Sequence, residues 1–292
     1  MTTQPKQHEV LAKAVSFLNK QNREPRVAHI LLQHHLNVSR AAFYAMMRDP
    51  VPEHVLDAFI NDIKKHAETG VPVQHLTGQA TFYGRDFTVN EDVLIPRPET
   101  EEVVQQAITM THECAEQNRP FTIVDVGTGS GVIAITLALE LPETTVYATD
   151  ISQAALTVAQ KNAHQLQAHV TFLEGDFLQP IIDNDILPNL VIANPPYIPS
   201  TSVAALPDTV KHFDPACALF AGKDGLAAYR TIMAQSKDIP APEAFIFEIG
   251  HDQGEAVQSL VRQTYPASDV TVHRDLHGKE RIVTAILHKS TD

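Results

Sequence analysis

Residues 122–139 read TIVDVGTGSGVIAITLAL, and this stretch decides the fold class. The apolar run Thr122–Val126 is typical of a buried strand, and Val132–Leu139 predicts a helix. The glycine loop between them, Gly127–Gly131, permits a tight turn and lets a ligand approach the backbone at the helix N-terminus. Its spacing differs from the G-x-G-x-x-G of dinucleotide-binding folds, and by itself it also fits a strand–helix turn without a ligand. The stretch therefore predicts an α/β protein and leaves the ligand open.

Strands and helices continue to alternate after this stretch. Helical segments separate the early strands, so the order favours a parallel, doubly wound sheet. Only Arg274–Glu280 joins the last two strands, which is too short for a crossover helix, so the final strand should run antiparallel to its neighbour. The further strands are predicted at Thr145–Thr149, Val170–Leu173, Leu190–Ala193, Ala244–Ile249, Val270–His273 and Arg281–Leu287.

The first 72 residues have a different pattern, in which apolar residues recur at helical spacing. Ser39 is suited to cap a helix over Arg40–Met47, and Pro52 and Gly70 flank a second helix over Glu53–Thr69. This part of the chain is predicted to form a small helical bundle.

A linker follows the helical part. Thr81–Val93 alternates apolar and polar residues, with turn residues at Gly84-Arg85 and Asn90-Glu91, and this predicts a hairpin. A helix with an acidic start is predicted at Glu99–Met110. We therefore expect a helical domain over residues 1–72, a β-hairpin linker over residues 73–98 and an α/β domain over residues 99–292.

Composition and charge narrow the class of protein. The chain has 292 residues, of which 43% are hydrophobic and 20% charged, as in ordinary globular proteins. We expect no signal peptide because residues 1–9 are polar, no membrane span, and no metal site, since the histidines and two cysteines lack metal-ligand spacing. A cytoplasmic protein is the resulting expectation.

The net charge of −13 is unevenly distributed. Residues 1–72 hold 9 Lys and Arg against 7 Asp and Glu, and residues 73–292 hold 13 against 28, giving +2 and −15. An acidic segment of this length is a poor counterion for a phosphate backbone, which disfavours duplex DNA as a partner.

The motif Asn194-Pro195-Pro196-Tyr197 follows the predicted strand Leu190–Ala193. The two prolines end the strand and hold the next residues extended. The Asn194 side-chain oxygen and the Pro195 carbonyl can accept both hydrogens of an –NH₂ group, and the Tyr197 ring can pack on the flat face of an amide or a base. Alone, the motif also fits a proline-rich turn after a core strand.

Acidic residues follow three successive predicted strands. Asp125 precedes the glycine loop, where it would repel a pyrophosphate and attract a cationic ligand. Asp150 ends the second strand, where a carboxylate grips ribose hydroxyls, and Asp176 and Phe177 follow the third, where they can hold an adenine edge and face. Each aspartate alone is more often a cap or turn residue. Together and in this order they indicate S-adenosylmethionine.

The chain thereby resembles class I S-adenosylmethionine-dependent methyltransferases that act on planar nitrogens. More closely, from about Val27 to the C-terminus, it is similar to the peptide-chain release factor glutamine methyltransferases, the PrmC/HemK family. The residues that carry this resemblance are His75–Gly78, Phe82–Gly84, Leu94–Glu101, Gly127–Gly131, Asn194–Tyr197, Asp224–Leu226 with Tyr229-Arg230, Glu248–Gly250 with Gln253-Gly254, and Asp275-Leu276 with Gly278. His75 stands where a Tyr or Trp is usual.

The resemblance implies a seven-stranded Rossmann-like methyltransferase sheet with an N-terminal helical domain that docks the substrate. The implied substrate is the glutamine of the Gly-Gly-Gln loop in class 1 release factors, with Asn194, Pro195 and Tyr197 as catalytic residues and Asn194–Tyr197, including Pro196, holding its amide. We expect a monomer that binds no DNA and no membrane. The expected cofactor-binding residues are Asp125, Gly127, Thr128, Gly129, Ser130, Gly131, Asp150, Asp176, Phe177 and Asn194.

Two other functions remain open from the residues. The motif at Asn194–Tyr197 also suits a flipped base, so one alternative is a nucleic-acid methyltransferase acting on an exocyclic amine of adenine or guanine. The other is a binding module without activity, which would have no need of an –NH₂ clamp. No His or Glu within the motif is placed as a base.

Overall fold

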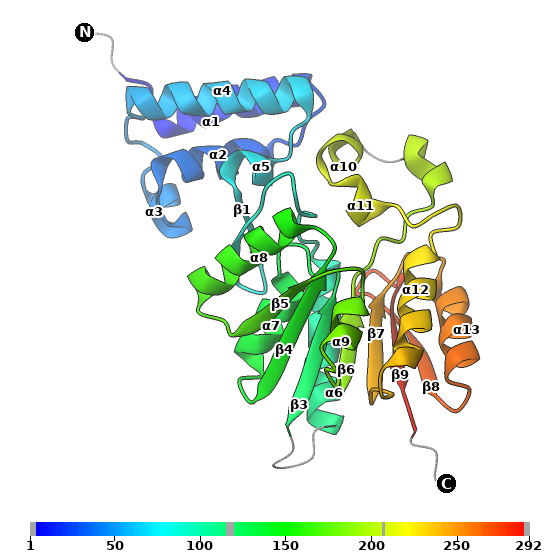
Figure 1. Ribbon diagram of the computed structural model, residues 1–292. Coiled ribbons are helices and arrows are strands. Elements are labelled where there is room, and N and C mark those ends of the chain that lie inside the picture. Colours follow the sequence, from blue (N-terminus) through cyan, green and yellow to red (C-terminus); the bar gives the residue numbers. More distant parts are fainter. Residues whose placement is uncertain (1–3, 115–119, 206–207, 289–292) are drawn as a thin grey trace. The chain divides into compact units, whose positions relative to one another are not determined.

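The computed structural model describes residues 4–114, 120–205 and 208–288. Within these residues the chain forms two compact units (Figure 1). The smaller unit contains the residues up to Gln79 together with the helix α10 (Asp208–Phe213), and the larger unit contains the rest. Each unit is described by itself below.

The smaller unit is helical, as the sequence predicts. Ser39 caps α3, because its hydroxyl accepts a hydrogen bond from the Ala42 N–H. Helix α4 ends at Gly70, whose φ of +75° is the left-handed conformation that glycine adopts without strain. The core of the smaller unit contains the buried Leu31, Phe43 and Phe59. Besides α10, its helices are α1 (Gln7–Lys20), α2 (Arg26–Leu36), α3 (Arg40–Ala45), α4 (Glu53–Thr69) and α5 (Val73–Thr77).

The predicted hairpin is present but shorter than the sequence suggests. Strands β1 (Gln79–Phe82) and β2 (Arg85–Thr88) pair in a two-stranded sheet. The turn lies at Tyr83-Gly84, one residue earlier than predicted, and both residues have positive φ, as a tight two-residue hairpin turn requires. Pairing stops at Thr88, because the Asn90 side chain accepts from the Asp92 N–H and starts a local turn.

The larger unit is built on a seven-stranded sheet with the strand order β5-β4-β3-β6-β7-β9-β8. Strands β3, β4, β5, β6 and β7 are parallel to one another. Strand β9 runs antiparallel to both β7 and β8, as predicted from the short final connection. The strands are β3 (Phe121–Val126), β4 (Thr144–Asp150), β5 (Val170–Glu174), β6 (Leu190–Ala193), β7 (Ala244–Glu248), β8 (Asp269–Arg274) and β9 (Glu280–Ile286).

Helices cover both faces of this sheet (Figure 1). Both faces of strand β6 are apolar and need cover, because successive side chains point to opposite faces. Leu190 and Ile192 pack in the core with α6 and α7, and Val191 and Ala193 pack in the core with α12 and α13. A strand buried on both faces reads as a continuous apolar run. The helical segments are α6 (Glu99–Cys114), α7 (Val132–Glu140), α8 (Gln153–Leu166), α9 (Gln179–Asp183), η1 (Ser200–Ala205), α11 (Ala216–Leu219), α12 (Ala227–Gln235), η2 (Ser236–Asp238) and α13 (Gly254–Thr264).

The strand order places two loops side by side. Strand β3 pairs with β4 on one side and β6 on the other, so the order of the sheet reverses between β3 and β6. The last residues of these strands, Val126 and Ala193, are partners in the register. The glycine loop and the Asn194–Tyr197 motif therefore leave the sheet next to each other, at the kind of switch point where open α/β sheets bind ligands.

No helix in the described part of the chain is long and apolar enough to cross a membrane.

Candidate active site

A pocket lies where the parallel strands of the larger unit end. Its lining combines the loops that follow β3, β4, β5 and β6 with the segment that leads into α6. The sequence-predicted residues in this lining are Gly127, Thr128, Gly129, Ser130, Asp150, Asp176, Phe177, Asn194 and Pro196. Asp125, Gly131, Pro195 and Tyr197 do not line it.

The three glycines of the loop have two different roles. All have positive φ, which favours glycine, at +74° for Gly127, +55° for Gly129 and +84° for Gly131. A Cβ atom on either of the first two would meet nothing within 4 Å, so their backbone is open to the pocket. A Cβ atom on Gly131 would lie 2.7 Å from Ile135 Cδ1 and 3.1 Å from Ala159 Cβ. Gly131 thus allows α7 and α8 to pack closely.

Asp125 lies behind the glycine loop. Its carboxylate is fully buried, and its Oδ2 accepts from the Thr128 hydroxyl at 2.6 Å and the Ala134 N–H at 3.2 Å. Oδ1 has no hydrogen-bond partner among the described residues. Burial raises the pKa of Asp125 to about 7, against the lowering effect of the Thr128 hydrogen bond. Asp125 shapes the loop from beneath, whereas the sequence suggested that it faces the ligand.

Asp150 faces the pocket and also holds its walls. Oδ2 accepts from the Gly129 N–H at 2.9 Å, and Oδ1 accepts from the Ser152 N–H at 2.8 Å. Each carboxylate oxygen can accept a further hydrogen bond, so both remain available to a vicinal diol. Burial raises the pKa of this half-buried carboxyl, and the two backbone hydrogen bonds oppose that rise.

The residues after β5 include one with an unfavourable backbone conformation, held by hydrogen bonds to its neighbours. Phe177 has a φ of +47°, which is unfavourable for an aromatic residue. Its carbonyl accepts from the Thr149 hydroxyl at 2.8 Å, and the Gln235 side chain bonds the neighbouring Asp176 carbonyl and Leu178 N–H. These bonds fix Asp176 and Phe177 in the pocket wall. Backbone strain of this kind is typical of functional sites.

Within the Asn194–Tyr197 motif, the first residue faces the pocket. The Asn194 side chain is half-buried, and its Nδ2 donates to the Thr100 hydroxyl at 3.3 Å. Pro195 is buried. The Tyr197 ring packs with the core on the α12 and α13 side of the sheet, and burial raises its pKa to about 12. In this structure Tyr197 anchors the motif, and its ring is not in the pocket wall where a flat ligand face would pack.

A glutamine from α13's start fixes the backbone of the motif. Gln253 Nε2 donates to the Tyr197 carbonyl at 2.9 Å and to the Gly225 carbonyl at 3.2 Å, and its Oε1 accepts from the Gly250 N–H. Every polar atom of this buried amide is therefore used. Our reading of the sequence gave Gln253 no role, although it lies in a segment that resembles the family.

Arg97 is a further pocket residue, to which our reading of the sequence gave no role. It lines the pocket, and its Nη2 donates to the buried Asp214 carboxylate at 2.7 Å. Arg97 therefore both lines the pocket and forms an ion pair. Nearby, Glu101 accepts from the Tyr83 N–H at 2.7 Å, which ties the hairpin turn to α6.

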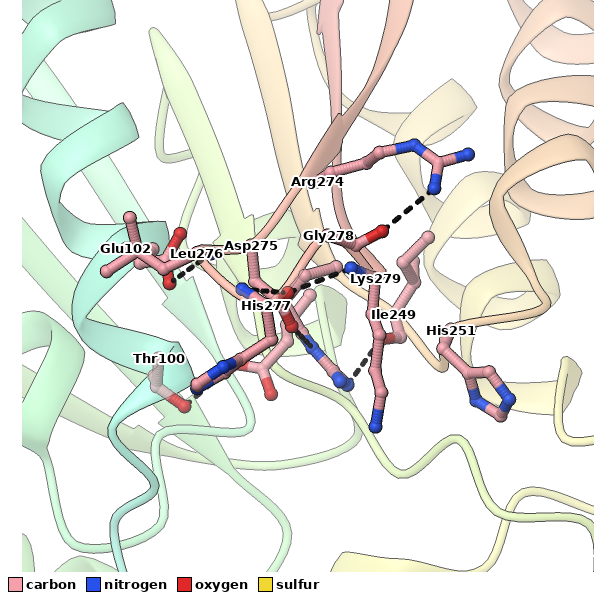
Figure 2. Close-up of polar contacts among 12 residues, drawn as sticks. Thr100, Glu102, Ile249, His251, Arg274, Asp275, Leu276, His277, Gly278 and Lys279 are labelled. Carbon is pink, nitrogen blue, oxygen red and sulfur yellow. Dashed lines mark hydrogen bonds and ion pairs between the residues drawn. The ribbon is translucent and has the colours of Figure 1, made fainter.

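The turn between β8 and β9 braces the end of β7. Figure 2 shows Asp275 at the start of this turn, where its Oδ1 accepts from the His277 and Lys279 N–H groups. Its Oδ2 faces the Arg281 guanidinium at 3.4 Å, and Arg281 in turn donates to the Ile249 carbonyl at 3.2 Å. The result is a hydrogen-bonded support for Ile249, the residue that follows Glu248 at the end of β7.

Within residues 4–114, 120–205 and 208–288, no three His, Cys, Asp or Glu side chains lie close enough together to hold a metal ion.

Comparisons with known proteins bear on the family of the chain. The family model described as the PrmC N-terminal domain matches residues 9–78, and the model described as the methyltransferase small domain matches residues 104–211. The chain is 41% identical over 283 residues to the release factor glutamine methyltransferase of Bacillus subtilis, covering 97% of this chain and 98% of that protein. It is 41% identical over 279 residues to the protein of the same name from Bacillus cereus, covering 95% and 98%.

Among solved structures, the fold is similar to that of the human METTL16 catalytic domain in complex with MAT2A 3′UTR hairpin 6. The TM-score is 0.54, with 15% sequence identity over 82% of this chain and 84% of the other. At that identity the similarity concerns the fold alone, and it confirms the predicted methyltransferase architecture.

Proposed function

The chain belongs to the release factor glutamine methyltransferase family, and from this premise we propose that it methylates the glutamine amide nitrogen in the Gly-Gly-Gln loop of class 1 release factors. The observation that carries the proposal is the position of Asn194, an amide acceptor in the wall of the same pocket as the glycine loop. A planar –NH₂ group held there lies next to the methyl donor.

The methyl donor is S-adenosylmethionine, and the pocket residues fit it. Gly127 and Gly129 leave open space where side chains would stand, and Asp150 offers two carboxylate oxygens to the ribose hydroxyls. In our proposal Asp176 and Phe177, which line the same pocket, hold the adenine. When bound, this donor would supply its sulfonium methyl group: the S–CH₃ bond breaks as the N–CH₃ bond forms, S-adenosylhomocysteine is left as the thioether product, and the nitrogen releases one proton to solvent.

The protein's contribution is placement and electrostatics. An amide nitrogen is a poor nucleophile, because its lone pair is delocalised into the carbonyl, so orientation accounts for much of the rate. The Asn194 side-chain oxygen, in the pocket wall, accepts a hydrogen bond from one N–H of the substrate amide. The backbone carbonyl of Pro195, next to Asn194 in the chain but outside the pocket lining, is proposed to accept from the other N–H, so that the two together aim the nitrogen. The same two acceptors stabilise the positive charge that develops on nitrogen during transfer. Tyr197 holds the motif in place from the core.

The parts of the chain divide this work in our proposal. Residues 1–72 dock the release factor, residues 73–98 form the linker, and residues 99–292 carry out the methyl transfer. The match of the PrmC N-terminal domain model to residues 9–78 supports the first assignment. We further propose that the enzyme acts as a monomer in the cytoplasm, where release factors function, without binding DNA or membranes.

The alternative acceptor is an exocyclic amine of a nucleic acid. The charge of −15 over residues 73–292 opposes it, because a phosphate backbone would be repelled. The family membership also favours a protein glutamine. A module that only binds S-adenosylmethionine or a release factor is opposed by the Asn194 side chain in the pocket wall.

One assay separates these functions. Purified protein is incubated with methyl-labelled S-adenosylmethionine and, in parallel, a class 1 release factor, its Gly-Gly-Ala variant, and total RNA or DNA. We expect label on the wild-type release factor only. Label on nucleic acid would replace the proposal with the alternative, and no label on any acceptor would indicate a binding module.

Replacing Asp150 should weaken binding of the methyl donor. Asp150→Ala removes both the ribose acceptors and the partner of the Gly129 N–H, so the Kd for S-adenosylmethionine should rise roughly 10- to 100-fold, since a hydrogen bond to a charged group contributes about 1.5–3 kcal/mol. Isothermal titration calorimetry measures this change. Glu174→Ala is the matched control, because Glu174 pairs with Asp150 in the register but lies outside the pocket. Equal Kd values for the two variants would refute the role of Asp150.

A further inference from the structure

We propose that Thr100 and Glu248 are positioning residues that orient the Asn194 side-chain amide, so that its oxygen faces the substrate nitrogen. The inference deepens the proposed function and rests on it. Three segments far apart in sequence supply the three groups, namely the start of α6, the end of β7 and the loop after β6. Strands β6 and β7 pair in parallel with Ala193 opposite Phe247, so the next residues, Asn194 and Glu248, lie side by side at the end of the two strands.

The three side chains form a directed chain of hydrogen bonds. The Thr100 hydroxyl donates to Glu248 Oε2 at 2.7 Å, and Asn194 Nδ2 donates to the same hydroxyl oxygen at 3.3 Å. A carboxylate only accepts hydrogen bonds, and a hydroxyl has a single hydrogen. With that hydrogen committed to Glu248, the Thr100 oxygen can only accept from Asn194. The group that faces Thr100 must therefore be the –NH₂ of Asn194, which directs its carbonyl oxygen elsewhere.

Burial makes this arrangement selective. Thr100 is 2% exposed and Glu248 is 1% exposed, so water has little access to either partner. An inverted Asn194 amide would place two acceptor oxygens against each other and present an –NH₂ to the substrate –NH₂. Leaving buried polar groups unpaired in this way costs about 1–3 kcal/mol for each group. The chain of bonds thus excludes the orientation that cannot hold an amide nitrogen.

The protonation of Glu248 gives the arrangement a pH dependence. Burial raises the pKa of Glu248 to about 7, while the Thr100 hydrogen bond and the positive charge of Arg281 oppose that rise. Below this pKa the protonated carboxyl can donate to Thr100, which frees the hydroxyl hydrogen to donate to an inverted Asn194. We expect kcat to fall as pH falls through about 7. The charged and titratable groups facing Glu248 are Arg97 and Glu99 at the start of α6, Arg281 on β9, Tyr197 after β6 and Tyr229 on α12.

The test compares two threonine substitutions on the same helix. Thr100→Val keeps the shape of the side chain and removes its hydroxyl, so kcat should fall on the order of 10²-fold, the size expected when a reacting group is misplaced by about 1 Å. The Kd for S-adenosylmethionine should stay near the wild-type value, and Thr100→Ser should recover most of the lost kcat. Thr111→Val is the control, because Thr111 is equally buried on α6 and its hydroxyl has no hydrogen-bond partner among the described residues.

The expected result is a loss of kcat in Thr100→Val that Thr111→Val does not show. The decline of kcat below about pH 7 should also be weaker in Thr100→Val than in the wild-type protein. Burial raises the pKa of Asp125 to about 7 as well, but both proteins contain Asp125, so it does not account for a difference between their pH profiles. Equal kcat values for Thr100→Val and Thr111→Val would overturn the inference.

A second measurement needs no catalysis and no folded Thr100 variant. In the wild-type protein one Asn194 side-chain amide proton is bonded to a buried hydroxyl, so it should exchange slowly with solvent in an ¹H–¹⁵N spectrum, assigned by its loss in Asn194→Ala. Fast exchange of both protons would overturn the inference. This readout does not involve the acceptor, so a slow proton combined with no label on the release factor would contradict the proposed function and leave the Thr100–Glu248 assignment intact.

Discussion

Asn194→Ala is expected to abolish measurable methylation while the protein still binds S-adenosylmethionine. The substitution removes the side-chain acceptor that aims the substrate nitrogen, and a single positioned hydrogen-bonding group of this kind contributes roughly 10²–10³ in kcat. The glycine loop, Asp150 and Phe177 remain in place, so the methyl donor should still bind. Turnover is measured with labelled S-adenosylmethionine and release factor, and donor binding by calorimetry.

The result has a clear control within the same protein. Asn194 is half-buried, and within the described residues its side chain makes one hydrogen bond, the donation to Thr100, so its removal should change the melting temperature little. A variant that melts like the wild-type protein, binds the donor and does not methylate is the predicted outcome. Near-normal methylation by Asn194→Ala would refute the proposed mechanism.

Gly225→Ala is expected to have the second large effect, on both stability and activity. Gly225 has a φ of +74°, and a Cβ atom there would lie 2.3 Å from the Tyr197 carbonyl oxygen and 2.7 Å from Gln253 Nε2. The left-handed conformation costs an alanine about 1–2 kcal/mol, and the added crowding costs typically 1–3 kcal/mol more. Since the clash displaces the backbone of the motif, kcat should fall as well.

Gly222→Ala separates the clash from the backbone strain. Gly222 has nearly the same φ, +72°, but a Cβ atom there would meet only Ala227 Cβ, at 3.4 Å. We therefore expect the melting temperature, measured by differential scanning calorimetry, to fall several degrees more for Gly225→Ala, and kcat to fall in that variant alone. Equal effects of the two substitutions on kcat would show that crowding at the Tyr197 carbonyl is unimportant.

Much of the larger unit follows from local sequence pattern. Leu190–Ala193 is a strand with the predicted bounds, because four consecutive apolar residues followed by Asn194 and two prolines leave few other conformations. The glycine loop and the ordered Asp150 and Asp176 were also predictable, since a parallel sheet places successive strand ends along one edge. In the structure these residues line one pocket.

Other features depend on contacts between distant segments. Thr100 and Glu248 are separated by 148 residues in the chain, and Gln253 and Tyr197 by 56, so no local pattern pairs them. The burial of Asp125 could not be predicted from the sequence either. Whether its side chain faces the ligand or supports the loop depends on how α7 packs against it. Gly131 resembles its two neighbouring glycines in sequence and differs only through its contact with α8.

The position of the transferred methyl group tests the central claim most directly. A class 1 release factor is incubated with the enzyme and S-adenosylmethionine, digested, and analysed by tandem mass spectrometry. We predict one added methyl group on the side-chain nitrogen of the glutamine in the Gly-Gly-Gln loop, present with the wild-type enzyme and absent with Asn194→Ala. A methyl group on any other residue, or an unmodified release factor in the presence of enzyme that binds the donor, would contradict the account.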